Sequence, residues 1–123
     1  MKIVIPINPV TKKNHGVLVT VKGRKMMLPS NAYAKWEKKC KEYIPERDFP
    51  IDEPINLKCL YFMQTRRKCD ITNLLQATCD MLVKYKILKD DNYSIVSSVD
   101  GTQVFYDKEN PRTEIYIEKK NQD

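Results

Sequence analysis

The sequence predicts an α+β fold: a two-layer α/β sandwich in which a mixed sheet carries two main helices on one face. Three observations lead to this expectation. Extended segments outnumber helical ones, and each of the two helical stretches has a single apolar stripe with which to cover a sheet. The length of 123 residues suits one domain, residues 1–123, with one hydrophobic core.

The first third of the chain predicts a strand, a hairpin and a helix. Residues 2–7, KIVIPI, read as a strand that Pro6 ends or confines to a sheet edge. The runs VLVTV and KMMLP flank KGR, in which Gly23 supplies the positive φ of a tight hairpin turn. Ser30 is a suitable N-cap for a helix that Pro45 ends. The apolar stripe of this helix consists of Tyr33, Trp36, Cys40 and Tyr43.

The rest of the chain predicts the centre of the sheet, a second helix and three more strands. Residues 55–64, INLKCLYFMQ, are apolar on both faces, as in a strand buried inside a sheet. A helix follows over residues 72–85. Its stripe consists of Leu74, Leu75, Thr78, Met81, Leu82 and Tyr85. The runs YSIVSSV, TQVFY and TEIYIEK then read as strands separated by turn sequences.

Composition narrows the class of partner. Lys and Arg number 22 against 16 Asp and Glu, a net charge of +6, and such a surplus favours polyanions: nucleic acid first, an acidic membrane surface second. No apolar run approaches the roughly 20 residues of a membrane span, and the N-terminus lacks the long apolar core of a signal peptide. We expect a soluble cytoplasmic protein without a membrane partner.

The cysteines predict neither zinc nor disulfides. Cys40, Cys59, Cys69 and Cys79 stand at least ten residues apart, and His15 is the sole histidine. This spacing contains no zinc-ligand motif, and a chain without a secretory signal has no oxidising compartment in which to form disulfides. Buried thiols are the better interpretation.

Aspartates stand at both ends of the second helix. Asp70 lies at its start, where free N–H groups favour a carboxylate, and Asp90 and Asp91 follow its end. The helix should also present one polar face, away from its apolar stripe. That face consists of Asn73, Ala77, Asp80 and Lys84. In an α/β layer the strand after Asp91 can lie beside the strand that delivers Asp70, so the two acidic ends can converge.

Converging carboxylates suit Mg²⁺, or Mn²⁺, because these hard ions prefer oxygen ligands and keep water that can attack a phosphate. Phosphodiester cleavage is the matching reaction. The alternative from spacing alone is that Asp70 only caps a helix and that Asp90 and Asp91 only form a turn.

Two basic segments are candidates for binding DNA. Lys12 and Lys13 lie in a polar loop, where they can clamp a phosphate or remain solvated. Arg66, Arg67 and Lys68 precede Asp70 and would place positive charge beside a cut site.

The frame formed by DITNL, DMLVK and the pair DD, after a strand and a basic run, resembles the RusA family of Holliday junction resolvases. The segments IPINPVTKKNH and MMLPSNAYAKWEKKC resemble that family's N-terminal Pro/Asn loop and first helix, so the resemblance covers nearly the whole chain. It implies a homodimeric, Mg²⁺-dependent endonuclease that cuts branched DNA: it nicks four-way junctions symmetrically. Such enzymes are typical of prophages and bacteria.

The resemblance also implies the site residues. Asp70 matches the family's first aspartate, and Asp90 with Asp91 matches its later pair, while Thr72 stands where the family has a second aspartate and Gln76 where it has a helix lysine. A hydroxyl is a poorer ligand than a carboxylate, and an amide does not neutralise a phosphate. The supporting residues are Thr72, Asn73, Gln76 and Asp80.

Three hypotheses remain open. Either Asp80 or water completes the metal shell and the chain is a resolvase, or Thr72 and Gln76 leave a non-catalytic junction-binding accessory protein. A third hypothesis is a general nucleic-acid-binding domain. The departures extend to Lys86, which stands where a glycine would ease the end of the helix.

Overall fold

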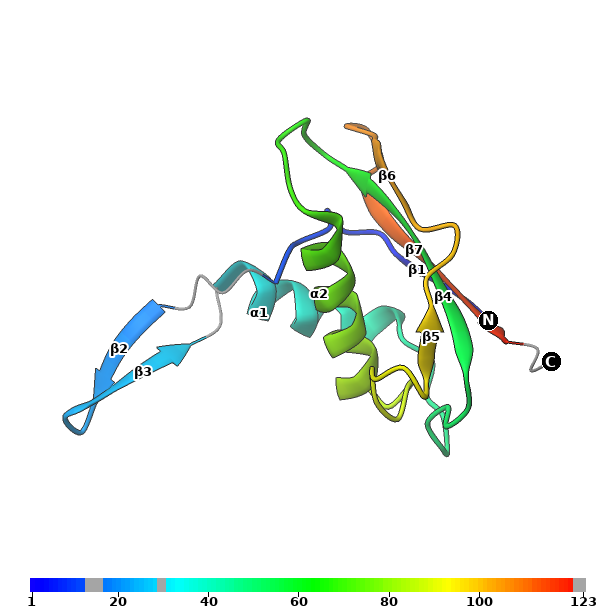
Figure 1. Ribbon diagram of the computed structural model, residues 1–123. Coiled ribbons are helices and arrows are strands. Elements are labelled where there is room, and N and C mark those ends of the chain that lie inside the picture. The colour runs from blue at the N-terminus through cyan, green and yellow to red at the C-terminus, as the bar shows by residue number, and fades with distance from the viewer. Residues whose placement is uncertain (13–16, 29–30, 121–123) are drawn as a thin grey trace.

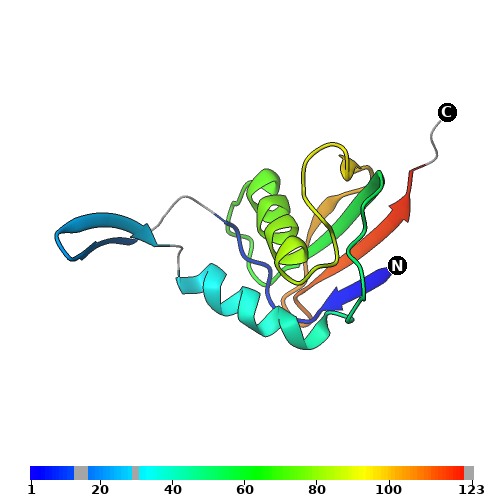
Figure 2. The same cartoon turned by 90° about the horizontal axis from the view of Figure 1, so that it is seen from below.

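Two layers form the body of the protein: two helices lie together on one face of a five-stranded sheet (Figures 1 and 2). The structure is a computed structural model, and it describes residues 1–12, 17–28 and 31–120. The predicted α+β class and the placement of both helices on one face of a mixed sheet are confirmed.

The sheet is mixed because β4 has both parallel and antiparallel neighbours. Its strands are β1 (Lys2–Ile5), β4 (Ile55–Met63), β5 (Val96–Ser98), β6 (Gln103–Tyr106) and β7 (Arg112–Lys119). The order is β1-β7-β4-β5, and β6 also pairs with β4. Strand β7 runs antiparallel to β1 and β4, whereas β5 and β6 run parallel to β4. The prediction that residues 55–64 form the central strand is confirmed.

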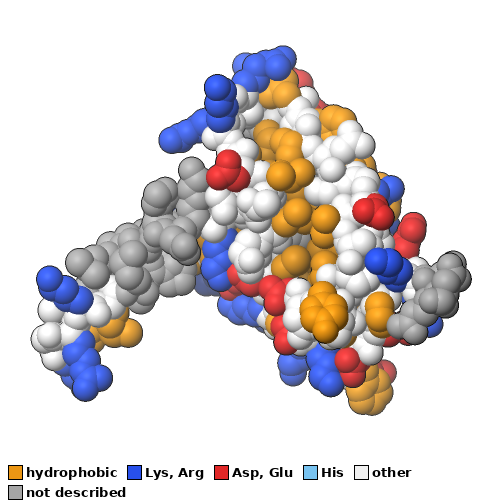
Figure 3. Space-filling model, in the orientation of Figure 1, with side chains coloured by type: hydrophobic (Ala, Val, Ile, Leu, Met, Phe, Trp, Pro, Cys, Tyr) orange, Lys and Arg blue, Asp and Glu red, His pale blue; other side chains and the backbone are white. Residues whose placement is uncertain are grey.

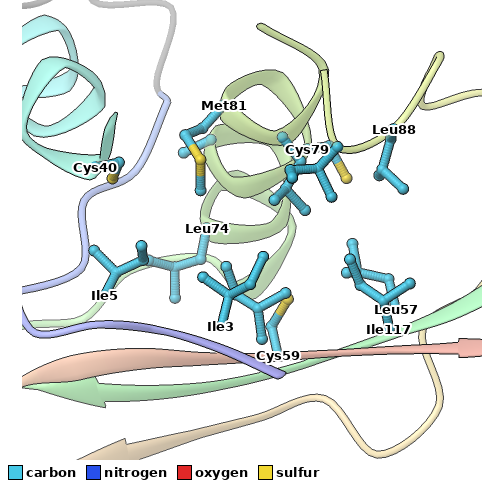
Figure 4. Close-up of a cluster of buried hydrophobic side chains, with 14 of the residues drawn as sticks. Ile3, Ile5, Cys40, Leu57, Cys59, Leu74, Cys79, Met81, Leu88 and Ile117 are labelled. Atoms are coloured by element: carbon cyan, nitrogen blue, oxygen red, sulfur yellow. The ribbon is translucent and has the colours of Figure 1, made fainter. Parts of the chain in front are cut away.

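The core lies between this sheet and helices α1 (Asn31–Cys40) and α2 (Ile71–Lys84). Figure 4 shows side chains of β1, β4, β7 and α2 pointing toward one another across the layer boundary. The residues of β4 that face the helices are Ile55, Leu57, Cys59 and Tyr61, all buried. Leu60 and Phe62, on the opposite face, are only partly buried, because both helices cover the same side. The expectation that β4 is buried on both faces is therefore wrong.

Helix α1 ends earlier than its apolar spacing predicts. Tyr33, Trp36 and Cys40 are buried as expected, but the chain tightens into a 3₁₀ turn, η1 (Lys41–Tyr43), and Tyr43 is 41% exposed. A 3₁₀ turn has three residues per turn instead of 3.6, so the stripe no longer faces the sheet. The proposed N-cap, Ser30, lies outside the described residues.

The end of α2 directs the chain toward Asp90 and Asp91. The N–H of Lys86 donates to the carbonyl of Val83 and that of Ile87 to the carbonyl of Leu82, the two bonds of a Schellman motif. Lys86 takes the left-handed conformation, with φ at 62°. Glycine would take this conformation without strain, as the sequence indicated.

A hairpin of β2 (Val17–Val21) and β3 (Arg24–Leu28) forms a second, two-stranded sheet that projects from the body (Figures 1 and 2). Lys22 and Gly23 form its turn with φ of 51° and 78°, as a type I′ turn requires. The predicted hairpin is confirmed.

Candidate active site

The polar side of α2 borders a shallow hollow of about 470 Å³ on the surface. Its lining residues are Lys12, Thr72, Asn73, Gln76 and Asp80. Four of the five come from α2, and they include Thr72 and Gln76, two of the positions at which the sequence departs from the RusA pattern. The polar face differs from the predicted one in one respect: Ala77 is fully buried in the core.

Lys12 reaches the hollow from the loop after β1. Its backbone N–H donates to the carbonyl oxygen of Asn73 at 3.1 Å, which fixes this loop against the first turns of α2. Its ammonium nitrogen lies 2.5 Å from Oδ2 of Asp80 and 5.1 Å from the centre of the Tyr33 ring. The loop thus places a cation beside a helix carboxylate.

Gln76 connects Asp80 with Asp91. Its Nε2 donates to Oδ1 of Asp80 at 2.9 Å and to Oδ2 of Asp91 at 3.5 Å. The same proximity affects Cys79, whose pKa rises to about 12 because the thiol is buried and because the carboxylates of Asp91 and Asp80 disfavour a thiolate. An acidic residue of α2 and one from the turn that follows it therefore both contact Gln76.

The turn that delivers Asp91 is held by its neighbour. Oδ1 of Asp90 accepts the backbone N–H of Asp91 at 2.7 Å, and Oδ2 accepts Nδ2 of Asn92 at 3.1 Å. Both carboxylate oxygens of Asp90 thus stabilise its own turn. Of the pair, Asp91 is the residue that contacts a side chain of α2.

Asp70 occupies the N-cap position of α2 in an extended backbone conformation. Its backbone oxygen accepts the N–H groups of Asn73 and Leu74, and its Oδ2 accepts Nδ2 of Asn73 at 3.3 Å. The side chain is exposed and makes no capping hydrogen bond to the helix backbone. Asp70 is linked to the hollow through Asn73, which also holds the Lys12 loop.

The acidic residues do not form a ready-made metal cage. Among residues 1–12, 17–28 and 31–120, no three His, Cys, Asp or Glu side chains are grouped so that they could hold a metal ion. The structure brings Asp80 and Asp91 to Gln76, and it leaves Asp70 beside Asn73. The assignment of Asp70, Asp90 and Asp91 as catalytic metal ligands stays a prediction.

Basic side chains gather over the loop between β4 and α2, at the top of Figure 3. Arg66, Arg67 and Lys68 are exposed there, and the guanidinium of Arg66 stacks over the ring of Tyr106, 4.1 Å from its centre. Arg67 and Lys68 also border a second hollow, of about 520 Å³, together with residues 8–11. The predicted basic segment therefore lies next to the start of α2, whereas Lys13 lies outside the described residues.

Sequence reasoning missed two contacts. The ion pair of Lys12 with Asp80 joins residues 68 positions apart, and no spacing rule connects them. The stacking of Arg66 on Tyr106 joins a loop to an edge strand in the same way. The sequence indicated the roles of the two residues separately: Lys12 as a residue that can bind a phosphate, and Asp80 as one that can complete the metal shell. It did not indicate that they contact each other.

Comparison with known protein families gives one match. The model of a family described as endodeoxyribonuclease RusA matches residues 6–118, and no curated protein matches the chain. The matched segment includes Lys12, the basic loop, all of α2 and the pair Asp90-Asp91. None of the helices within the described residues is long and apolar enough to cross a membrane.

Proposed function

Since the chain belongs to the RusA family of endodeoxyribonucleases, we propose that it is a divalent-metal-dependent, structure-selective nuclease that resolves four-way DNA junctions. The observation that supports this most is the meeting of Asp80 and Asp91 at Gln76, beside the cation of Lys12. A carboxylate of α2 and a carboxylate of the turn after it both contact Gln76, a residue that lines the hollow, next to positive charge that a DNA strand requires.

The donors fit Mg²⁺, with Mn²⁺ as the alternative. Mg²⁺ is usually bound through one or two carboxylates, several waters and substrate phosphates. Oxygens of Asp80 and Asp91 both lie within 3.5 Å of one amide nitrogen, so two carboxylates are at hand. Asp90 adjoins Asp91 in sequence, and Asp70 contacts Asn73, another residue of the hollow. A bound Mg²⁺ would supply activated water and stabilise charge on the phosphate.

The remaining residues of the hollow hold the DNA strand. Lys12 offers a cation to a phosphate, Gln76 offers an amide N–H, and the hydroxyl of Thr72 can donate to the same group. The ammonium group of Lys12 forms an ion pair with Asp80, so a phosphate that enters the hollow must compete with that carboxylate for it. Asp80 is then left free to accept another cation.

The basic loop extends the contact. Arg66, Arg67 and Lys68 are exposed beside the start of α2, where they can bind phosphates on either side of the cut. Charge and hydrogen bonds to phosphate carry no sequence information, so this segment would fix the position of the strand rather than select a base.

A second function is supported by Thr72 and Gln76: a non-catalytic, junction-binding accessory protein of recombination. The hollow contains no carboxylate at residue 72 and no cation at residue 76, and an inactive site could still bind branched DNA. In either case we propose a homodimer acting in the cytoplasm of a bacterium, encoded by the host or by a prophage.

A labelled four-way junction tests both functions. Incubated with Mg²⁺, the resolvase produces paired nicks on opposing strands, and the same reaction in EDTA is the control for metal dependence. Binding to the junction without nicks supports the accessory protein. Equal binding to the junction and to linear duplex of the same sequence contradicts both functions and leaves a general DNA-binding domain.

A further inference from the structure

The hairpin of β2 and β3 is not extended by any other strand. Among the described residues its two strands pair only with each other, and Figures 1 and 2 show it projecting from both layers of the body. A two-stranded ribbon alone is marginally stable in water, and it becomes stable when it packs against a partner. The charge and the exposed side chains of the ribbon therefore indicate the chemistry of its partner.

The charge of the ribbon matches DNA. The twelve residues VLVTVKGRKMML contain no Asp or Glu, and three cations stand at or next to the turn. These are Lys22, Arg24 and Lys25, all exposed. Figure 3 shows Lys and Arg side chains at the outer end of the ribbon. Like charges oppose the packing of this tip against the same tip of a second copy, whereas a phosphate backbone attracts it.

The apolar part of the ribbon is compatible with the same partner. Val21 and Met26, next to the tip, are 49% and 48% exposed. Small and flexible apolar side chains can contact thymine methyl groups in the major groove, which is about 12 Å wide and admits a two-stranded ribbon.

The ribbon is connected in sequence to segments at the candidate active site, and its tip is separated from them by the length of its strands. In sequence, β2 follows Lys12, which lines the hollow, and β3 precedes α1, whose Tyr33 ring has its centre 5.1 Å from the ammonium nitrogen of Lys12. Each strand has five residues, so the ribbon reaches about 17 Å outward at about 3.3 Å per residue. A phosphate in the hollow would thus have its adjoining duplex arm within reach of the tip.

We propose that the ribbon of β2 and β3 is a duplex-binding arm whose tip, Lys22, Arg24 and Lys25, contacts phosphates of the DNA arm next to the cut strand. The proposal rests on the proposed function, because it takes the hollow as the place where DNA is cut.

The test removes the charge and keeps the turn. In the tip variant Lys22→Asn, Arg24→Gln and Lys25→Gln are combined; Asn-Gly is the preferred pair for a type I′ turn, so the ribbon keeps its geometry. The matched control combines Lys41→Gln, Lys119→Gln and Lys120→Gln, which removes the same charge from η1, from the last residue of β7 and from the residue after it, at the far side of the body from the ribbon. Binding to a long-armed junction and to linear duplex is measured in EDTA over a range of salt concentrations.

We expect the tip variant to bind both DNAs about tenfold or more weakly than the wild type, with a salt slope smaller by about two to three. The control variant should keep the wild-type slope. Equal slopes for the two variants overturn the proposal. A lower sedimentation mass of the tip variant with an unchanged slope also overturns it, in favour of an arm that binds a second copy.

Cleavage separates this proposal from the proposed function. If the wild type does not cut or prefer a junction but the salt slope of the tip variant is still smaller by about two to three, the proposed function is wrong, and the ribbon is a duplex-binding arm without a cut site beside it. If the wild type cuts junctions and the slope is unchanged, the arm is wrong and the function stands.

Discussion

The ammonium nitrogen of Lys12 lies 2.5 Å from Oδ2 of Asp80, and both side chains border the hollow on α2 that Thr72 and Gln76 also line. In the RusA pattern a lysine stands on this helix, at the position of Gln76. Lys12 enters the same hollow from a different segment, so the positive charge that Gln76 lacks is present at the site from another source.

We expect Lys12→Met to lower the rate of junction cleavage by about 100-fold, the usual cost of removing one charge-stabilising group from an active site. The free energy of unfolding should change by less than about 1 kcal/mol, because the ion pair of Lys12 with Asp80 is partly exposed. Lys84→Met is the matched control, since Lys84 forms an ion pair of equal length with Glu37 outside the hollow.

The decisive variant adds Gln76→Lys to Lys12→Met. It places a lysine at the helix position and should recover most of the lost rate. If the folded double variant is as slow as Lys12→Met, the two positions do not share a role.

Asp91→Asn should abolish cleavage and leave junction binding unchanged or tighter. The change removes a carboxylate that faces Gln76 and that also repels phosphate. Asp100→Asn is the control, since Asp100 lies in the loop between β5 and β6, outside the hollow. Single-turnover cleavage and binding in EDTA measure the two effects separately, and wild-type cleavage by Asp91→Asn would falsify the assignment of this residue.

Thr72→Asp should raise the affinity for Mg²⁺, because it places a carboxylate on the hollow where the RusA pattern has one. The measurement is a Mg²⁺ titration of junction cleavage, with Thr72→Asn as the control of similar size and no charge. If the Mg²⁺ concentration for half-maximal cleavage is unchanged or higher, another residue already supplies the carboxylate that Thr72 lacks. Asp80, which contacts Gln76, is the candidate for that residue.

Cys69 should be the one thiol of the native protein that a maleimide modifies rapidly. Burial raises the pKa of Cys40, Cys59 and Cys79 to about 12, so these thiols stay protonated and covered at pH 8. Cys69 is partly exposed and borders the same hollow as Arg67 and Lys68. Mass spectrometry should find one label per chain.

The label should also stop DNA cleavage, because it sits next to Asp70 and the basic loop. Cys69→Ser should cut normally and resist the reagent. Continued cleavage by the fully labelled wild type would place the DNA strand elsewhere.

The fold was predictable where local pattern and tertiary packing agree. The stripe of Leu74, Met81 and Leu82 located α2 to within a residue, because these side chains are the ones that pack on the sheet. The pattern was wrong at Tyr43 and Ala77. A 3₁₀ turn changed the direction of Tyr43, and a small residue such as alanine carries little information about its side of a helix.

The site was predictable in its residue types but not in its contacts. Asp70, Asp90 and Asp91 could be selected because they lie at the ends of elements in a recognisable frame. The bridge from Gln76 to Asp91 depends on the Schellman turn after α2 and on side-chain rotamers, and neither can be read from spacing. From the sequence we expect the strand after Asp91 to lie beside the strand before Asp70. This part of the expectation is confirmed, because β5 pairs with β4.

We expect the protein to act as a dimer. A four-way junction is nearly two-fold symmetric and needs cuts on two opposing strands, yet one chain contains one set of Asp70, Asp80 and Asp91. A closed two-fold dimer presents two such sites through one self-complementary patch. Sedimentation at micromolar concentration should therefore give about twice the chain mass of 14.5 kDa.

Strand β6 is the surface that we expect to form this dimer. Val104, Phe105 and Tyr106 are each about 40% exposed on it, and an edge strand can pair with the same strand of a second copy. Val104→Lys should shift the protein toward the monomer, while Val99→Lys, a similarly exposed valine outside the strands, should not. A wild-type protein that stays monomeric with and without junction DNA would contradict paired cutting, and with it the resolvase itself, because no second site would then be available for the opposing strand.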